Sequence, residues 1–119
     1  MKKIGDPRHQ KRVRSFIELF TASFSKQEVI EDFTKRCLEN KEAIDSLIAK
    51  SAPLWPVEKI GKVDLAILRL AVYEMTIEKK TPPKVIIDEA IEIAKEFGGD
   101  SSPKFVNGAL GKILSWIAS

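Results

Sequence analysis

The sequence predicts an all-α fold, a single compact bundle of five or six helices. Apolar residues recur at spacings of three and four along most of the chain, and no useful stretch shows the period-two alternation of a strand. Proline and glycine fall mainly between the periodic stretches. The chain has 119 residues, of which 44% are hydrophobic, and this suffices for one core. We therefore expect residues 1–119 to form one domain, with 1–7 as a flexible basic tail.

Residues 8–24 carry the first predicted helix. Its apolar stripe consists of Val13, Phe16, Ile17, Phe20 and Phe24. Four cations stand in its first two turns: Arg8, Lys11, Arg12 and Arg14. Positive charge there opposes the helix macrodipole at a cost of roughly 0.3–1 kcal/mol per residue. Two interpretations remain open: the charges serve an interaction outside the fold, or they form a solvated terminus that improves solubility.

The segment 26–50 is also helical in spacing. Ser25 and Glu28 match a capping box, which predicts a helix beginning at Lys26. The expected buried face consists of Val29, Ile30, Phe33, Cys37 and Leu38, followed by Ala43, Ile44, Leu47 and Ile48. Asn40 marks an end or a bend, so one bent helix and two helices both remain open. The single cysteine has no partner for an internal disulfide, and we interpret it as a small buried hydrophobe.

Pro53 and Pro56 break the helical pattern before the most apolar segment, residues 62–78. That segment is hydrophobic almost all round, which is typical of a central helix covered on several sides. Arg69 interrupts its longest apolar run, so no membrane span is predicted. We interpret Arg69 as a structural arginine that caps a helix end or pairs with a carboxylate.

Two further helices are predicted after Pro82. The first runs over 83–97 and stops at Gly98 and Gly99. The second begins at a cap among residues 100–102, with Pro103 in its first turn. Acidic residues at 88, 92 and 96 share one face of the 83–97 helix, and we interpret them as a solvated surface rather than a metal site.

The charge of the chain is unevenly distributed. Residues 1–14 hold six basic side chains and one acidic, whereas the remainder holds more acidic than basic groups. This asymmetry favours a polyanionic partner at the N-terminus and a different, basic partner for the body. His9 is the only histidine, and we interpret it as an exposed residue among arginines. No nucleophile elbow, phosphate loop or metal motif is present, so we expect no enzyme, no cofactor and no metal.

The C-terminal half contains three characteristic segments, VDLAILRLAVYEM at 63–75, PKVIIDEAIEIAKEFG at 83–98 and KFVNGAL at 104–110. With these segments the chain resembles the NusB family of transcription antitermination factors. The order and spacing of these motifs are specific together, and they cover roughly residues 55–114. Arg8 and Arg12, followed by Leu19 and Phe20, look like the arginine-rich first helix of the family.

The resemblance implies an all-α fold, no catalysis and binding to boxA-like single-stranded RNA of ribosomal RNA transcripts. It also implies pairing with the ribosomal protein NusE and an indirect association with other Nus factors and RNA polymerase, in the cytoplasm. The RNA-facing residues carried over from the family are Arg8, Arg12, Phe97, Lys104 and Phe105, and charge and position add Lys2, Lys3, His9 and Lys11. The NusE-facing residues are Asp64, Asp100 and Ser101. Monomer and homodimer both remain open.

The chain departs from the family pattern in three ways. The segment between the first helix and the central one is shorter than usual, Ile17 stands where the family often has glutamine, and Ser101 stands where an acid is common. Two other functions stay open on the sequence. One is a helical protein-interaction adaptor without an RNA role. The other is a stand-alone relative of the RNA-binding domain of ribosomal RNA cytosine methyltransferases.

Overall fold

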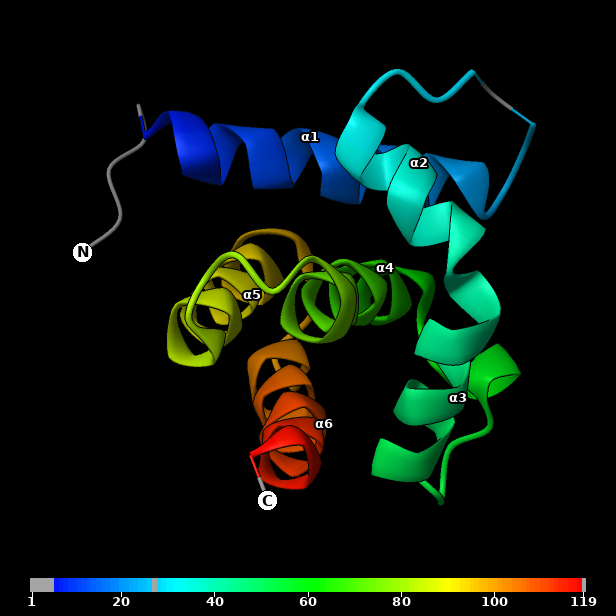
Figure 1. The fold of residues 1–119 in the computed structure, drawn as a ribbon. Helices are drawn as coiled ribbons and strands as arrows, with labels where there is room; N and C mark the ends of the chain where they lie inside the picture. The colour runs from blue at the N-terminus through cyan, green and yellow to red at the C-terminus, as the bar shows by residue number, and fades with distance from the viewer. Residues whose placement is uncertain (1–5, 27, 119) are drawn as a thin grey trace.

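The computed structural model describes residues 6–26 and 28–118, which form the helical bundle shown in Figure 1. The α-helices are α1 Pro7–Ala22, α2 Asp32–Glu39, α3 Lys41–Ser51, α4 Lys62–Tyr73, α5 Pro83–Phe97 and α6 Ser102–Ile117. A 3-10 turn, η1 Val57–Lys59, precedes α4, and a π-helical turn, η2 Glu74–Glu78, follows it. The predicted all-α bundle of five or six helices is therefore confirmed, with six α-helices within the described ranges.

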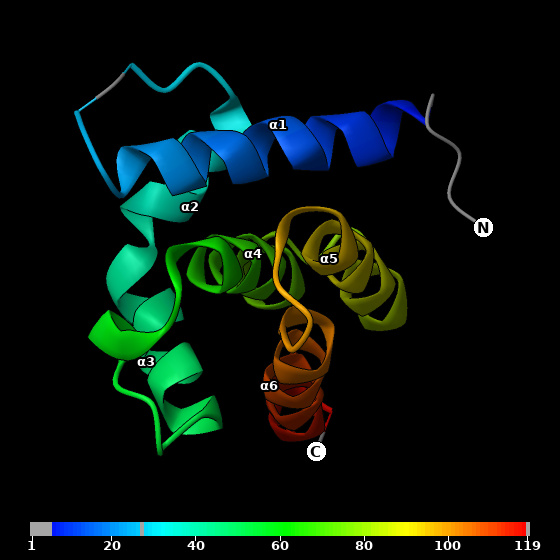
Figure 2. The ribbon, with the colours of Figure 1, turned by 180° about the vertical axis from the view of Figure 1, so that it is seen from behind.

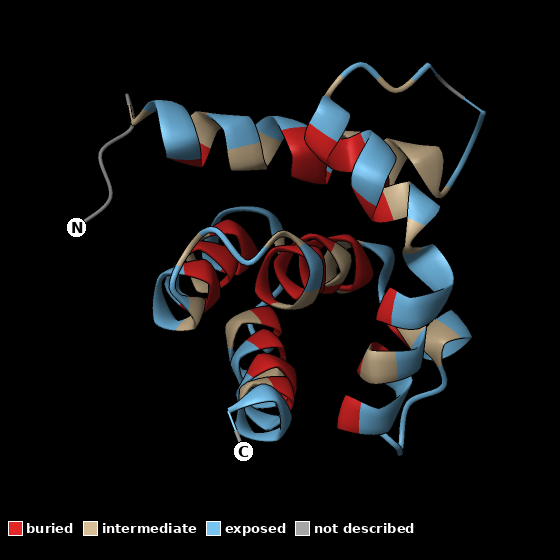
Figure 3. Cartoon of the chain, viewed as in Figure 1, coloured by how far each residue is buried: buried red, intermediate tan, exposed pale blue. Residues whose placement is uncertain are grey.

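Helix α4 is the central element. It contacts α1, α2, α3, α5 and α6, and it lies nearly end-on in the middle of the molecule in Figures 1 and 2. Most of its surface is buried (Figure 3). Leu68 and Val72 are fully buried. Helix α1 lies across α4 and α5, while α6 contacts the opposite side of α4 (Figure 2). The prediction of a covered central helix is confirmed.

Helix α1 begins one residue earlier than expected. The Asp6 side chain accepts a hydrogen bond from the Arg8 backbone N–H at 2.9 Å, and Pro7 occupies the first turn. Residues 6 and 7 therefore belong to the helix start and not to a tail. The helix ends at Ala22 rather than Phe24. Phe24 is 61% exposed, so its placement on the buried stripe was wrong.

The predicted helix start at Lys26 is wrong. Helix α2 begins at Asp32, and the described residues just before it are not helical. The cause is a tertiary contact, because the Glu18 carboxylate of α1 accepts hydrogen bonds from the backbone N–H groups of Ile30 and Glu31. Ile30 is accordingly exposed instead of buried. Residues 32–51 form two helices that meet at Asn40, which resolves the alternative left open.

Two side chains in the first half of the core behave as expected. Arg69 forms a bidentate pair with Asp45, at 2.9 Å for each hydrogen bond, which ties α4 to α3. Cys37 is 1% exposed, and burial raises the pKa of its thiol to about 12. A thiol held in this way is unreactive at neutral pH. Among the described residues, no helix combines the length and apolar character that a bilayer crossing requires.

The connection from α5 to α6 requires its first glycine. A Cβ atom at Gly98 would lie 2.5 Å from the Ser102 Oγ and 2.8 Å from the Ala94 carbonyl oxygen. The Ser102 hydroxyl in turn accepts a hydrogen bond from the Gly99 backbone N–H. This close approach folds the chain back sharply, so that the first turn of α6 lies next to the end of α5.

Candidate nucleic-acid interface

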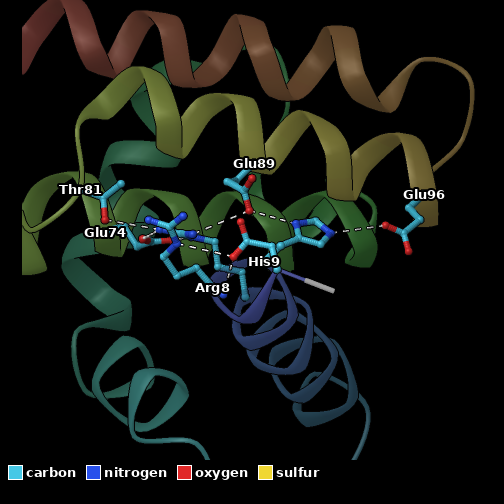
Figure 4. A network of polar contacts seen from close by, with 8 residues as sticks. Arg8, His9, Glu74, Thr81, Glu89 and Glu96 are labelled. Atoms are coloured by element: carbon cyan, nitrogen blue, oxygen red, sulfur yellow. Dashed lines mark hydrogen bonds and ion pairs between the residues drawn. The ribbon is translucent and has the colours of Figure 1, made fainter. Parts of the chain in front are cut away.

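A buried polar network fastens the start of α1 to the bundle (Figure 4). Arg12 donates two hydrogen bonds of 2.8 Å to the Glu74 carboxylate and a longer one of 3.4 Å to Thr81. The His9 Nδ1 lies 2.9 Å from the Glu89 carboxylate, and its Nε2 lies 3.8 Å from that of Glu96. Arg12 and His9, on one face of α1, thus meet carboxylates on η2 and α5.

The π-helical turn places Glu74 for this contact. The Lys79 backbone N–H donates to the Glu74 carbonyl oxygen, which closes the wide turn, and Lys79 takes a left-handed conformation with φ 57°. Glu74 is 1% exposed, so its charge needs a partner inside the protein. The hydrogen bonds from Arg12 supply it, and Glu74 raises the pKa of the Arg12 guanidinium. Burial and the nearby Glu74 raise the pKa of Glu78.

This network corrects the interpretation of two α1 residues. His9 is 8% exposed and lies against Glu89, so the expectation of an exposed histidine was wrong. The Arg12 side chain is 11% exposed and its donors face Glu74, Thr81 and Glu89. Sequence reasoning placed both residues in an RNA site because it could not identify their acidic partners, which lie more than sixty residues away.

The other cations of the first helix turns face solvent. The Arg8 side chain is 85% exposed, and the Asp6 carboxylate near it lies at 3.5 Å. Lys11 is exposed, with its ammonium 5.0 Å from the centre of the Phe33 ring. Lys2 and Lys3, also predicted to face RNA, lie outside the described residues. An exposed cationic edge, made of Arg8 and Lys11, therefore lies at the start of α1.

Phe97 lies where α5 meets α1. Its ring centre is 5.1 Å from that of Phe16, and the side chain is still 40% exposed. Part of the Phe97 ring therefore packs against the core, as its helical spacing indicated. The rest of the ring is accessible at the surface. The contact places the end of α5 beside the middle of α1. Arg8 and Lys104 lie on different helices, α1 and α6, and form no hydrogen bond or ion pair with each other.

Asp64, Ser101 and Phe105, which are distant in sequence, come together in one hollow. This loop hollow has a volume of about 320 Å³ and is lined by Trp55, Lys59, Ile60, Gly61, Asp64, Ser101 and Phe105. The Asp64 Oδ1 is buried and has no hydrogen-bond partner among the described residues. Asp100 is exposed beside the hollow, in the turn before α6. The predicted partner-facing residues therefore cluster, with an unpaired acidic oxygen among them.

Lys104 and Phe105 open α6 next to this hollow. Lys104 is exposed and forms no ion pair with any residue that the structure describes. Phe105 is half-buried, with part of its ring against the core and part lining the hollow. A free cation beside a partly exposed aromatic ring is an arrangement that can hold a nucleotide.

Sequence reasoning missed three residues of this region. Glu74 and Glu89 were read only as parts of helices, although a carboxylate within an apolar helical stretch indicates a buried partner. Trp55 was read only as part of a proline break, yet it is 54% exposed and lines the loop hollow. A tryptophan between two prolines, outside any helical pattern, is the sequence signal that could have identified it. No cluster of metal-ligating side chains occurs within 6–26 and 28–118.

Comparison with known proteins identifies the family. The family model described as the NusB family matches residues 6–115. The transcription antitermination protein NusB of Acetivibrio thermocellus is 40% identical over 105 residues, a match that covers 88% of this chain and 72% of that protein.

Solved structures agree with this assignment. T. maritima NusB superposes with a TM-score of 0.82 at 35% identity, covering 95% of this chain and 92% of that one. A crystal structure of the antitermination factors NusB and NusE in complex with double-stranded RNA gives a TM-score of 0.76 at 21% identity. That match covers 91% of this chain and 97% of the other, and it bears on the fold alone.

Proposed function

The chain belongs to the NusB family of transcription antitermination proteins, and we propose that it acts as an RNA-binding antitermination factor. In this proposal it binds boxA-like single-stranded RNA of ribosomal RNA transcripts and pairs with the ribosomal protein NusE. It would reach RNA polymerase and the other Nus factors through that complex, in the cytoplasm. The family consists of non-enzymatic factors, so we expect no catalytic step.

The observation that carries the RNA proposal is the set of solvent-facing cations that lie on the helices that carry the partly exposed aromatic rings or beside those rings. Arg8 and Lys11 are exposed at the start of α1, and Lys104 is exposed beside Phe105 at the start of α6. Phosphates require accessible cations, and unpaired bases stack on accessible rings. Phe97, Lys2 and Lys3 remain part of the proposed surface. Arg12 and His9 act indirectly, because their bonds to Glu74 and Glu89 hold α1 in position.

The partner proposal rests on the loop hollow. NusE is a ribosomal protein, and proteins of that class are generally basic because they bind RNA. A buried carboxylate oxygen without a hydrogen-bond partner favours an incoming cationic or N–H donor. Asp64 supplies this oxygen, and Asp100 adds exposed acidic charge nearby. Ser101 adds a hydroxyl group in the position where the family often has an acid.

The RNA proposal is tested by titrating fluorescein-labelled boxA-like RNA with the full chain, with and without NusE. We expect log Kd to rise linearly with the logarithm of the salt concentration, because binding releases counterions from the RNA. We also expect tighter binding when NusE is added. A labelled RNA of equal length and scrambled sequence is the control. Absence of binding at low salt, with and without NusE, would refute the RNA proposal.

Asp64→Lys should separate the two partners. Placing a cation in the loop hollow repels a basic protein, so we expect NusE capture to fall at least tenfold while RNA binding by the chain alone is retained. Capture is measured after nuclease treatment, which removes RNA bridging. Glu58→Lys, an exposed carboxylate of η1, makes the same charge change outside the lining of the hollow and serves as the control. Unchanged capture by Asp64→Lys would place the NusE contact elsewhere.

A further inference from the structure

A second hollow, here called the α6 groove, shares Trp55 and Phe105 with the loop hollow. It has a volume of about 290 Å³ and is bounded by the chain after α3 and by one face of α6. Its lining residues are Ser51, Ala52, Pro53, Leu54, Trp55, Lys104, Phe105, Gly108, Ala109 and Lys112. Because Trp55 and Phe105 line both hollows, the two are neighbours on the surface.

The tryptophan of this groove is held in an exposed position. Its backbone N–H donates to the Ala52 carbonyl oxygen at 2.9 Å, which closes a turn, and Pro53 and Pro56 restrict the chain on either side. The residue is 54% exposed, although burial would be the favourable state for so large an apolar ring. A rigid turn that presents an aromatic face loses little conformational entropy when a flat ligand stacks on it.

The positive charge at the edge of the α6 groove favours an anionic ligand. Lys104, Gly108 and Lys112 are four residues apart, so they form one ridge along α6. Both lysines are exposed and form no ion pair with a described residue, and no carboxylate lines the groove. Gly108 keeps the space between the lysines open, because a Cβ atom there would meet nothing within 4 Å. An apolar, aromatic slot with two free cations on its edge fits a planar apolar group that is attached to an anion.

We propose that the α6 groove is a nucleotide subsite, in which an unpaired base of the bound RNA stacks on Trp55 while its flanking phosphates contact Lys104 and Lys112. This inference rests on the proposed RNA-binding function and extends it from Lys104 and Phe105 along α6 by two further helical turns. RNA is the occupant favoured by charge and by continuity with those two residues. A second copy of the chain would place lysines against lysines across a two-fold interface unless it offered its own acidic face.

Two variants of Trp55 test the stacking. In the titration of labelled boxA-like RNA, Trp55→Ala should weaken binding about 5- to 100-fold, the usual cost of removing one stacked base contact. Trp55→Phe should restore most of the loss. In a Trp116→Phe background, Trp55 is the only tryptophan, and its fluorescence should be quenched as the RNA saturates the protein.

Filling the α6 groove tests its location without weakening the fold. Gly108→Gln should reduce RNA affinity at least tenfold and leave or raise thermal stability, since glutamine favours a helix over glycine. The matched control is Gly111→Gln, an exposed glycine of α6 whose Cβ position is equally open and which does not line the groove. It should gain stability similarly and keep its affinity.

The outcomes distinguish this proposal from the one it rests on. Full RNA affinity in both Trp55→Ala and Gly108→Gln, with unquenched Trp55 fluorescence, would overturn the subsite and leave the RNA-binding function standing. Failure of the unaltered chain to bind RNA would overturn both. A molar mass by light scattering that drops from dimer to monomer only in Trp55→Ala, with RNA affinity unchanged, would assign the groove to a second copy and overturn the subsite.

Discussion

Replacing Arg12 by alanine should cost about 3–5 kcal/mol of unfolding free energy, the usual range for breaking one side of a buried ion pair. Both partners are inside the protein, with the side chains of Arg12 and Glu74 at 11% and 2% exposure. Removing the guanidinium leaves the Glu74 charge buried without its two hydrogen bonds. The loss is measured by urea unfolding followed by circular dichroism, with the slope of the transition checked for constancy.

Arg14→Ala is the matched control. Arg14 is in the same helix and pairs with Glu31 at 2.7 Å, but its side chain is 59% exposed, so its removal should cost about 0–1 kcal/mol. The double variant Arg12→Met with Glu74→Met should recover much of the stability, because an apolar pair can replace a buried ion pair. A loss under 1 kcal/mol in Arg12→Ala would contradict the buried network and return Arg12 to the RNA surface.

The fold was predictable where one segment decides its own structure. The all-round apolar character of residues 62–78 predicted a central helix, and α4 with η2 spans those residues. Glycines 98 and 99 predicted a stop, and α5 ends at Phe97. The structural role of Arg69 followed from its position in the most apolar run, and the pair with Asp45 decides between the two roles left open, a helix cap and a carboxylate pair.

The prediction failed where a distant residue changes the local outcome. Ser25 and Glu28 formed a valid capping signal, but Glu18 binds the backbone N–H groups of Ile30 and Glu31 and moves the helix start to Asp32. The same limit applies to two residues of the candidate site, Arg12 and His9. Charge on α1 indicated a partner for Arg12 and His9, and that partner proved to be internal, because carboxylates of η2 and α5 fold onto the same face.

The two exposed cations that remain at the ends of the proposed surface should carry the largest functional effect. Arg8→Glu combined with Lys104→Glu should weaken RNA binding about 10- to 100-fold at moderate salt. The slope of log affinity against log salt concentration should become smaller in magnitude by roughly 1.4, the amount expected when two phosphate contacts to a single strand are lost. Both substitutions place an acid in the first turn of a helix, where it favours the macrodipole. Stability should therefore hold or increase.

Arg36→Glu combined with Lys41→Glu is the matched control, since it also changes one arginine and one lysine and alters net charge equally. These residues lie where α2 meets α3, on the side of the molecule away from the start of α1 (Figure 1). If the control weakens binding as much as Arg8→Glu with Lys104→Glu, then net charge alone governs affinity and no localised RNA surface exists. If only the paired change at Arg8 and Lys104 acts, cations from the two ends of the chain contribute to one RNA surface.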